Sequence, residues 1–96
     1  MEVVTLCGSM RFAPEMQRIA MELETKHGYC VLQPIFDTDV VLSEKDLDNL
    51  SKAHFKKIEI SDIVYIVNIG GYIGESVTKE LQYAKKLNKK IFFHEA

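Results

Sequence analysis

Several features that would assign a protein to a class at once are missing from this sequence. It has no tryptophan, two prolines and two cysteines, and no apolar run near the roughly 20 residues of a transmembrane helix. The N-terminal stretch MEVVTLCG lacks the basic start and long apolar segment of a secretory signal peptide. We therefore expect no membrane partner and a cytoplasmic location.

The cysteines and histidines lack the spacing of a disulfide framework or a metal site. Cys7 and Cys30 both fall on expected strands, which predicts buried free thiols, although Cys7 precedes a candidate site loop and could also touch a ligand. The three histidines, His27, His54 and His94, are scattered and form no HxH or HExxH pattern. The sequence therefore predicts no metal site.

An excess of basic residues is also lacking. Twelve lysines and arginines face 14 acidic residues, for a formal net charge of -2, which argues against a nucleic acid polymer as partner. The hydrophobic share of 47% and the charged share of 27% are typical of a globular chain. With 96 residues, the sequence predicts one domain over 1–96.

What the sequence does contain is an alternation of β-rich and helical patterns. Because strands that alternate with helices pair in parallel through right-handed crossovers, we expect a four-stranded parallel sheet in a three-layer α/β sandwich of the flavodoxin-like or Rossmann-like kind, in the order βαβαβαβ. The predicted strands cover 2–7, 29–34, 62–68 and 89–94, and the predicted helices cover 12–27, 43–60 and 75–88.

In such open sheets, ligands bind beyond the carboxyl ends of the strands. Three segments reach that edge here, at 8–11, 34–39 and 68–74. The last contains Gly71, Tyr72 and Gly74. The two glycines, which have no side chain and precede a helix start, let the backbone approach a phosphate or sugar oxygen. Tyr72 could stack on a base or sugar. The alternative is a tight strand-to-helix turn without a ligand.

The other two segments offer polar groups for the same ligand. Gly8, Ser9 and Arg11 could hold one phosphate or carboxylate, although Ser9 could equally be a helix cap with Arg11 in solvent. Asp37 follows the second strand, where a carboxylate can accept hydrogen bonds from ribose hydroxyls or simply be solvated.

Two side chains on helices could carry chemistry. Glu80 lies at the margin of the inward stripe centred on Val77, so its carboxylate could be partly desolvated and act as a nucleophile or a general acid or base. Alternatively, Glu80 is exposed beside Lys79 or Lys85. His54 faces inward on its helix, either as a hydrogen-bonded core residue or as a site residue.

Three stretches, in this order, resemble the nucleoside 2-deoxyribosyltransferase superfamily, which also contains the 2'-deoxynucleoside 5'-phosphate N-hydrolases: VTLCGSMR, SDIVYIVN and GESVTKELQYA. The resemblance implies a flavodoxin-like fold and a homodimer or larger homo-oligomer. It also implies cleavage of the N-glycosidic bond of a 2'-deoxynucleoside or its monophosphate, without a cofactor.

By this resemblance, Glu80 is the nucleophile, because Glu80 and Ala84 match the family's Glu-x-Gly-x-Ala pattern, with Gln82 in place of the glycine. The Gly-Ser-x-Arg segment that matches 8–11 would hold a 5'-phosphate or 5'-hydroxyl, and Ser76 would lie near the same group. His54 stands where the family has a catalytic aspartate. This departure leaves open an alternative, a non-catalytic nucleoside- or nucleotide-binding regulatory module.

Overall fold

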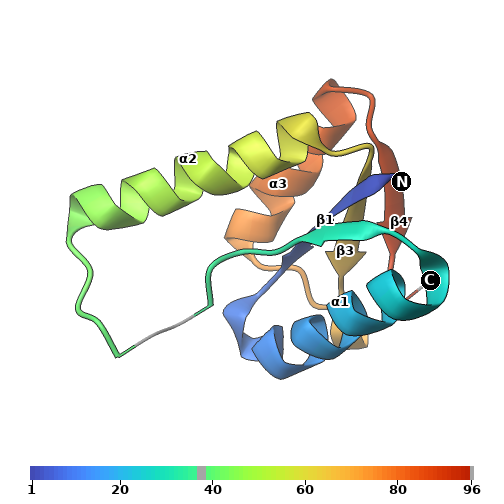
Figure 1. Ribbon diagram of the computed structural model, residues 1–96. Coiled ribbons are helices and arrows are strands. Elements are labelled where there is room, and N and C mark those ends of the chain that lie inside the picture. The colour runs from blue at the N-terminus through green and yellow to red at the C-terminus, as the bar shows by residue number, and fades with distance from the viewer. Residues whose placement is uncertain (37–38, 96) are drawn as a thin grey trace.

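The alternation of strands and helices predicted from the sequence is confirmed by the computed structural model, which describes residues 1–36 and 39–95 (Figure 1). The predicted ligand contact Asp37 falls outside the described residues. The elements are β1 (Val3–Gly8), η1 (Met10–Phe12), α1 (Ala13–His27), β2 (Cys30–Leu32), α2 (Glu44–Ile60), β3 (Ile63–Val67), η2 (Ile69–Gly71), α3 (Glu75–Lys86) and β4 (Lys90–Phe93), where η marks a short 3-10 helix.

The four strands form one parallel sheet in the order β2-β1-β3-β4. Helix α1 covers one face, and α2 and α3 lie together on the other (Figure 1). The protein therefore has the three-layer flavodoxin-like α/β fold expected from the sequence. The central strands β1 and β3 end side by side, with Cys7 opposite Ile66 and Gly8 opposite Val67.

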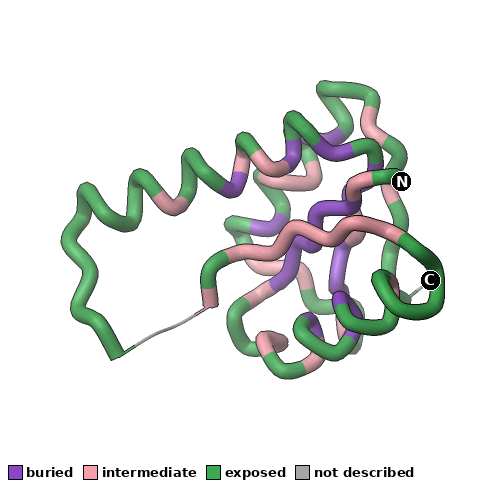
Figure 2. The backbone as a smooth tube through the Cα atoms, in the orientation of Figure 1, coloured by how far each residue is buried: buried purple, intermediate pink, exposed green. Residues whose placement is uncertain are grey.

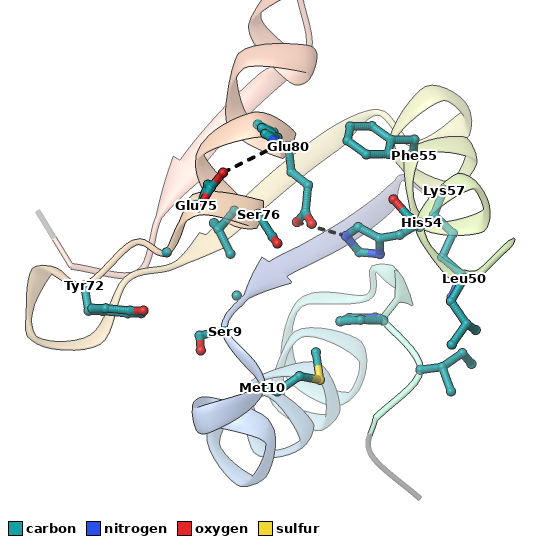
Figure 3. A pocket seen from close by; sticks show the side chains of 17 residues that line it. Ser9, Met10, Leu50, His54, Phe55, Lys57, Tyr72, Glu75, Ser76 and Glu80 are labelled. Carbon is teal, nitrogen blue, oxygen red and sulfur yellow. Dashed lines mark ion pairs between the residues drawn. The ribbon is translucent and has the colours of Figure 1, made fainter. Parts of the chain in front are cut away.

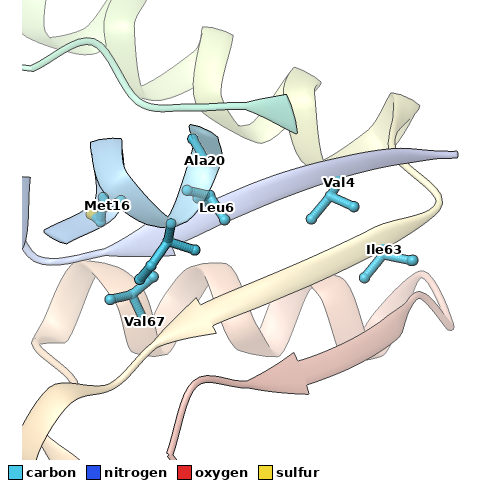
Figure 4. Close-up of a cluster of buried hydrophobic side chains, with 7 residues drawn as sticks. Val4, Leu6, Met16, Ala20, Ile63 and Val67 are labelled. Carbon is cyan, nitrogen blue, oxygen red and sulfur yellow. The ribbon is translucent and has the colours of Figure 1, made fainter. Parts of the chain in front are cut away.

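Successive residues of the central strands point to opposite faces, which gives the sheet two buried clusters. The α1 face contains Val4, Leu6, Met16, Ile19, Ala20, Ile63 and Val67 (Figure 4). The opposite face contains Cys7, Ile58, Val64, Ile66, Val77 and Ala84. Because the second cluster includes residues of both α2 and α3, it fixes those two helices against the strand ends where a ligand is expected.

Local sequence signals set the helix ends. The side chain of Ser43 accepts a hydrogen bond from the amide of Asp46, and the Asp46 side chain accepts one from the amide of Ser43, which forms a capping box at the start of α2. Gly28 ends α1 in the left-handed conformation, with φ 71°. Both positions agree with the sequence analysis.

The second strand is shorter than predicted. Its ladder covers three residues, Cys30–Leu32, at one edge of the sheet. An edge strand has a neighbour on one side only, so Cys30 is half-buried and the prediction of a fully buried thiol is wrong there. The same prediction is confirmed for Cys7, which is fully buried.

The first turns of α2 project beyond the sheet (Figures 1 and 2). All residues from 44 to 49 are exposed, including Leu47, and the apolar Val41 and Leu42 just before the helix are exposed as well. Only from His54 onward does α2 bury side chains. Among the described residues, none of the helices combines the length and apolar character needed to cross a bilayer.

Candidate active site

A cavity of about 520 Å³ opens at the carboxyl ends of the strands, between the turn after β1, helix α2 and the start of α3 (Figure 3). Its volume lies in the usual range for small-molecule sites. The lining residues are Gly8, Ser9, Met10, Pro34, Ile35, Leu50, Ser51, His54, Phe55, Lys57, Tyr72, Gly74, Glu75, Ser76, Val77, Lys79 and Glu80.

Most of the candidate site residues therefore meet at one cavity. Seven of them line it: Gly8, Ser9, His54, Tyr72, Gly74, Ser76 and Glu80. Arg11 and Gly71 are not among the lining residues. The sequence analysis placed the segment 34–39 at this edge but did not single out Ile35, and it missed Leu50 and Phe55 of α2, because the apolar character of these residues is equally typical of the core.

Glu80 lies in the second turn of α3, between the buried residues Val77 and Ala84. Its side chain is 16% exposed, and its Oε1 lies 3.3 Å from Nε2 of His54 (Figure 3). The nearby Lys79 pairs instead with Glu75, at 3.8 Å. Glu80 is therefore a partly desolvated carboxylate at the cavity wall and does not form the exposed lysine contact considered from the sequence.

His54 is buried and contributes to both the cavity and the core. Besides the contact with Glu80, its Nε2 lies 3.4 Å from Sγ of Cys7. Its Nδ1 is buried and has no hydrogen-bond partner among the described residues. Three groups from β1, α2 and α3 thus converge at one point: the Cys7 thiol, the His54 imidazole and the Glu80 carboxylate.

The environment of Cys7 keeps its thiol protonated. Burial raises the pKa of Cys7 well above its ordinary value, and the charge of Glu80 and a hydrogen bond to the Glu80 carboxylate raise it further. A protonated thiol is a poor nucleophile, so in this state Cys7 is a hydrogen-bonding group and not an attacking one. The sequence offered one sign of this contact, since Cys7 directly precedes the glycine turn at the end of β1.

The sequence left two alternatives for the turn after β1, a ligand-binding segment or a helix cap, and the turn has features of both. Oγ of Ser9 accepts a hydrogen bond from the Arg11 amide at 3.3 Å, so Ser9 caps the η1 turn and also lines the cavity. The Arg11 guanidinium lies 3.8 Å from the centre of the Tyr72 ring, a distance typical of a cation–π contact. Tyr72 therefore connects the turn after β1 with the glycine turn after β3.

The glycines serve the backbone in different ways. Gly70 and Gly71 have φ values of 65° and 78°, in the left-handed region that glycine enters without strain. A Cβ at Gly8 would lie 2.9 Å from Sδ of Met16 and 3.0 Å from Cβ of Val67. Turn geometry explains the first two glycines, and close packing explains Gly8.

The fold and the cavity at the strand ends define a flavodoxin-like α/β protein with a small-molecule-sized site. Within that class, the structure is similar to a 2-desoxiribosyltransferase from Leishmania mexicana, with a TM-score of 0.69 over 97% of this chain, at 14% sequence identity. The chain thus has a nucleoside 2-deoxyribosyltransferase-like fold, as the sequence resemblance implied.

The chain spans 63% of the length of that structure. A scan against models of known protein families finds no match. A search of curated proteins finds none either.

Proposed function

We propose that this protein cleaves the N-glycosidic bond of a 2'-deoxynucleoside or its 5'-monophosphate, with Glu80 as the nucleophile and residues 1–96 acting as one domain. The observation that carries the proposal is the Glu80 carboxylate, which is 16% exposed and lies at the wall of a cavity of about 520 Å³. A desolvated carboxylate beside such a cavity suits attack on a sugar carbon. The fold likeness supports the choice of a nucleoside substrate.

The reaction follows the retaining course of glycoside cleavage. An oxygen of Glu80 attacks C1' of the deoxyribose as the bond from C1' to the base nitrogen breaks, and the departing base keeps the bonding electron pair and takes up a proton. The intermediate is an ester between Glu80 and C1'. Water then attacks C1' and releases Glu80 with net retention, or a second base does so and completes a transfer.

In this scheme, His54 is the group that orients Glu80 and supplies a proton. Its Nε2 lies 3.3 Å from Oε1 of Glu80, close enough to hold the carboxylate in one rotamer. A histidine can also give a proton to the departing base. His54 thereby replaces the aspartate that the family resemblance places there.

The 5' end of the substrate would lie at the glycine turns. Ser9, Gly8 and Gly74 line the cavity with a hydroxyl and backbone, and Ser76 lies in the first turn of α3. Helix starts favour anions. Arg11, held over Tyr72 at 3.8 Å, adds a positive charge beside these groups, which supports a monophosphate at this end.

We also propose that the protein forms a homodimer or larger homo-oligomer through the projecting part of α2. Val41, Leu42 and Leu47 are exposed there, and a second copy of the chain would bury them. Sedimentation analysis of the wild type and Leu47→Glu tests this: the wild type should sediment as an oligomer and the variant as a monomer.

A cytoplasmic location is supported by the two free cysteines, since reducing compartments keep thiols unpaired.

The alternative is a regulatory module that binds a nucleoside or nucleotide without turning it over. One observation favours it: His54 offers no carboxylate where the family resemblance implies an aspartate. A module of this kind would bind deoxynucleosides with the same affinity before and after long incubation, without release of free base.

Incubation with a panel of deoxynucleosides and their monophosphates, with and without an acceptor base, tests the two functions. Chromatography should reveal free base, and a new deoxynucleoside where transfer occurs. Equal base release by the wild type and Glu80→Ala would contradict the role of Glu80. Tight binding without any release would favour the regulatory module.

A further inference from the structure

Hydrogen bonds do not fully account for the close approach of the Cys7, His54 and Glu80 side chains. Nε2 of His54 lies 3.4 Å from the sulfur of Cys7 and 3.3 Å from an oxygen of Glu80. A ring nitrogen has a single hydrogen or a single lone pair, directed along one line in the ring plane. It cannot serve both neighbours fully, whereas an ion placed between the three groups would contact each of them.

Two of the three separations between the ligand atoms agree with those around one tetrahedral ion. Zinc binds sulfur at about 2.3 Å and histidine nitrogen or carboxylate oxygen at about 2.0–2.2 Å. At the tetrahedral angle, such an ion separates sulfur from nitrogen by about 3.5 Å and nitrogen from oxygen by about 3.4 Å. The observed separations are 3.4 and 3.3 Å, and all three ligand atoms lie within 4.8 Å of one another.

We propose that Cys7, His54 and Glu80 bind a zinc ion, and that this ion blocks the reaction proposed above. A sulfur, nitrogen and oxygen donor set suits zinc, whereas magnesium and calcium prefer oxygen alone. On binding, the thiol gives its proton to solvent, and His54 binds through a deprotonated Nε2 with its ring hydrogen on Nδ1. Thiolate, carboxylate and Zn²⁺ together then carry no net charge. The ion enters through the cavity, which His54 and Glu80 line, and its fourth position is left for water.

The inhibitory part of this inference rests on the proposed function. Zinc bound to an oxygen of Glu80 withdraws electron density from the carboxylate and occupies the space in front of it, so the ion and the deoxynucleoside compete for the same side chain. The site should bind zinc more weakly than one whose histidine has an outer-shell partner, because Nδ1 of His54 has no partner among the described residues. Loss of such outer-shell support typically weakens metal affinity by about 10–100-fold.

The test uses the full chain with Zn²⁺ and with Co²⁺ as a spectroscopic substitute. Calorimetry should give one zinc ion per chain, and Co²⁺ should produce the near-ultraviolet absorption of a thiolate–cobalt bond. In Cys7→Ser that absorption should vanish and zinc affinity should fall by at least about tenfold. The matched control is Cys30→Ser, which removes the other thiol, outside the cluster, and should retain both properties.

A second variant guards against a failure of Cys7→Ser to fold. Glu80→Gln alters a side chain that is partly exposed, and should keep the thiolate–cobalt absorption while weakening zinc binding by at least about tenfold. A cobalt complex without thiolate absorption in the wild type, or zinc affinity unchanged in both variants, would overturn the inference.

The outcome for the metal is separate from that for the enzyme, because absorption and calorimetry need no turnover. If base is released, zinc should inhibit competitively with the deoxynucleoside, and Cys7→Ser should be less sensitive. If the wild type and Cys7→Ser are inhibited equally at the same zinc concentration, the proposed inhibition through this site is refuted. If no base is released at all, the proposed function fails while the cobalt spectrum still decides whether the site exists.

Discussion

Oε1 of Glu80 and Nε2 of His54 lie 3.3 Å apart, although the two residues belong to different helices. Their contact depends on how α2 and α3 pack over the same face of the sheet. Ile58 of α2 and Val77 and Ala84 of α3 share one buried cluster with the central strands. Core packing thus fixes the position of the His54–Glu80 pair, while both side chains also line the cavity.

Replacement of Glu80 by glutamine should reduce base release by at least about 1000-fold, because the amide has nearly the shape of the carboxylate but is a poor nucleophile. Binding of a deoxynucleoside should persist, since the cavity is unchanged in size. Rapid-quench measurement of free base, together with equilibrium binding, checks both expectations.

Glu75→Gln is the matched control for that experiment. Glu75 lines the same cavity on the same helix, but its side chain is 87% exposed and pairs with Lys79. An exposed ion pair contributes little, so activity should stay within about threefold of the wild type. Equal losses in the two variants would show that Glu80 has no special role.

Loss of the Arg11 side chain should affect the KM of phosphorylated and unphosphorylated substrates differently. A charged hydrogen bond contributes about 1.5–3 kcal/mol, so Arg11→Ala should raise KM for a monophosphate by about 10–100-fold and leave that for the nucleoside nearly unchanged. Arg18→Ala, which removes an exposed arginine away from the cavity lining, is the control. A similar change with both substrates would argue against a phosphate at Arg11.

Gly8→Ala should destabilise the fold by about 1–3 kcal/mol, because the added methyl group would crowd Met16 and Val67. Chemical denaturation measures this cost. It should fall when Met16 is also replaced by alanine, since the crowded sulfur is then absent. The cost of Gly70→Ala, which arises from a φ of 65° with open space around the new methyl group, should not change in that background.

The capping box of α2 predicts a dependence of stability on pH. Hydrogen bonds from the backbone and side chain of Ser43 lower the pKa of Asp46 below its ordinary value. A carboxyl group with a lower pKa in the folded state stabilises the fold above its unfolded pKa of about 4, and this contribution is lost as the pH falls from there through the lower folded pKa.

The wild type should therefore lose more stability on acidification than Asp46→Asn. Ser43→Ala should show an intermediate dependence, because it removes the Ser43 side chain but keeps the backbone hydrogen bond that lowers the pKa of Asp46 most. It should cost about 1 kcal/mol near neutral pH. Urea denaturation at several pH values measures both effects. Parallel pH profiles for all three proteins would contradict the assignment.

The order of elements could be predicted from the sequence because each depends on local features. The apolar runs of β1 and β3, the Ser43 cap and the Gly28 stop each act over a few residues. The length of β2 could not be predicted in the same way, because its end depends on pairing with β1 alone. Whether β2 lies at the edge of the sheet depends on the order of all four strands, which no local sequence signal gives.

The candidate site was predictable in part for the same reason. Strand order places Ser9, Tyr72 and Glu80 at one edge once a parallel sheet is assumed. The contact between Cys7 and His54 was not predictable, since it depends on the rotation of α2 about its own axis and on which face of β1 carries position 7. Motif searches depend on spacing within one segment, whereas these groups come from three.

The ring of Tyr72 contacts two residues of the turn after β1: the Arg11 guanidinium lies 3.8 Å from its centre, and the Phe12 ring makes an edge-to-face contact at 6.1 Å. A molecule that stiffens one of the two turns will stiffen the other, and the conformational entropy of ordering them is then lost only once. For the substrate proposed above, fragments such as a sugar phosphate alone or a free base alone should consequently bind more weakly than their separate contacts imply.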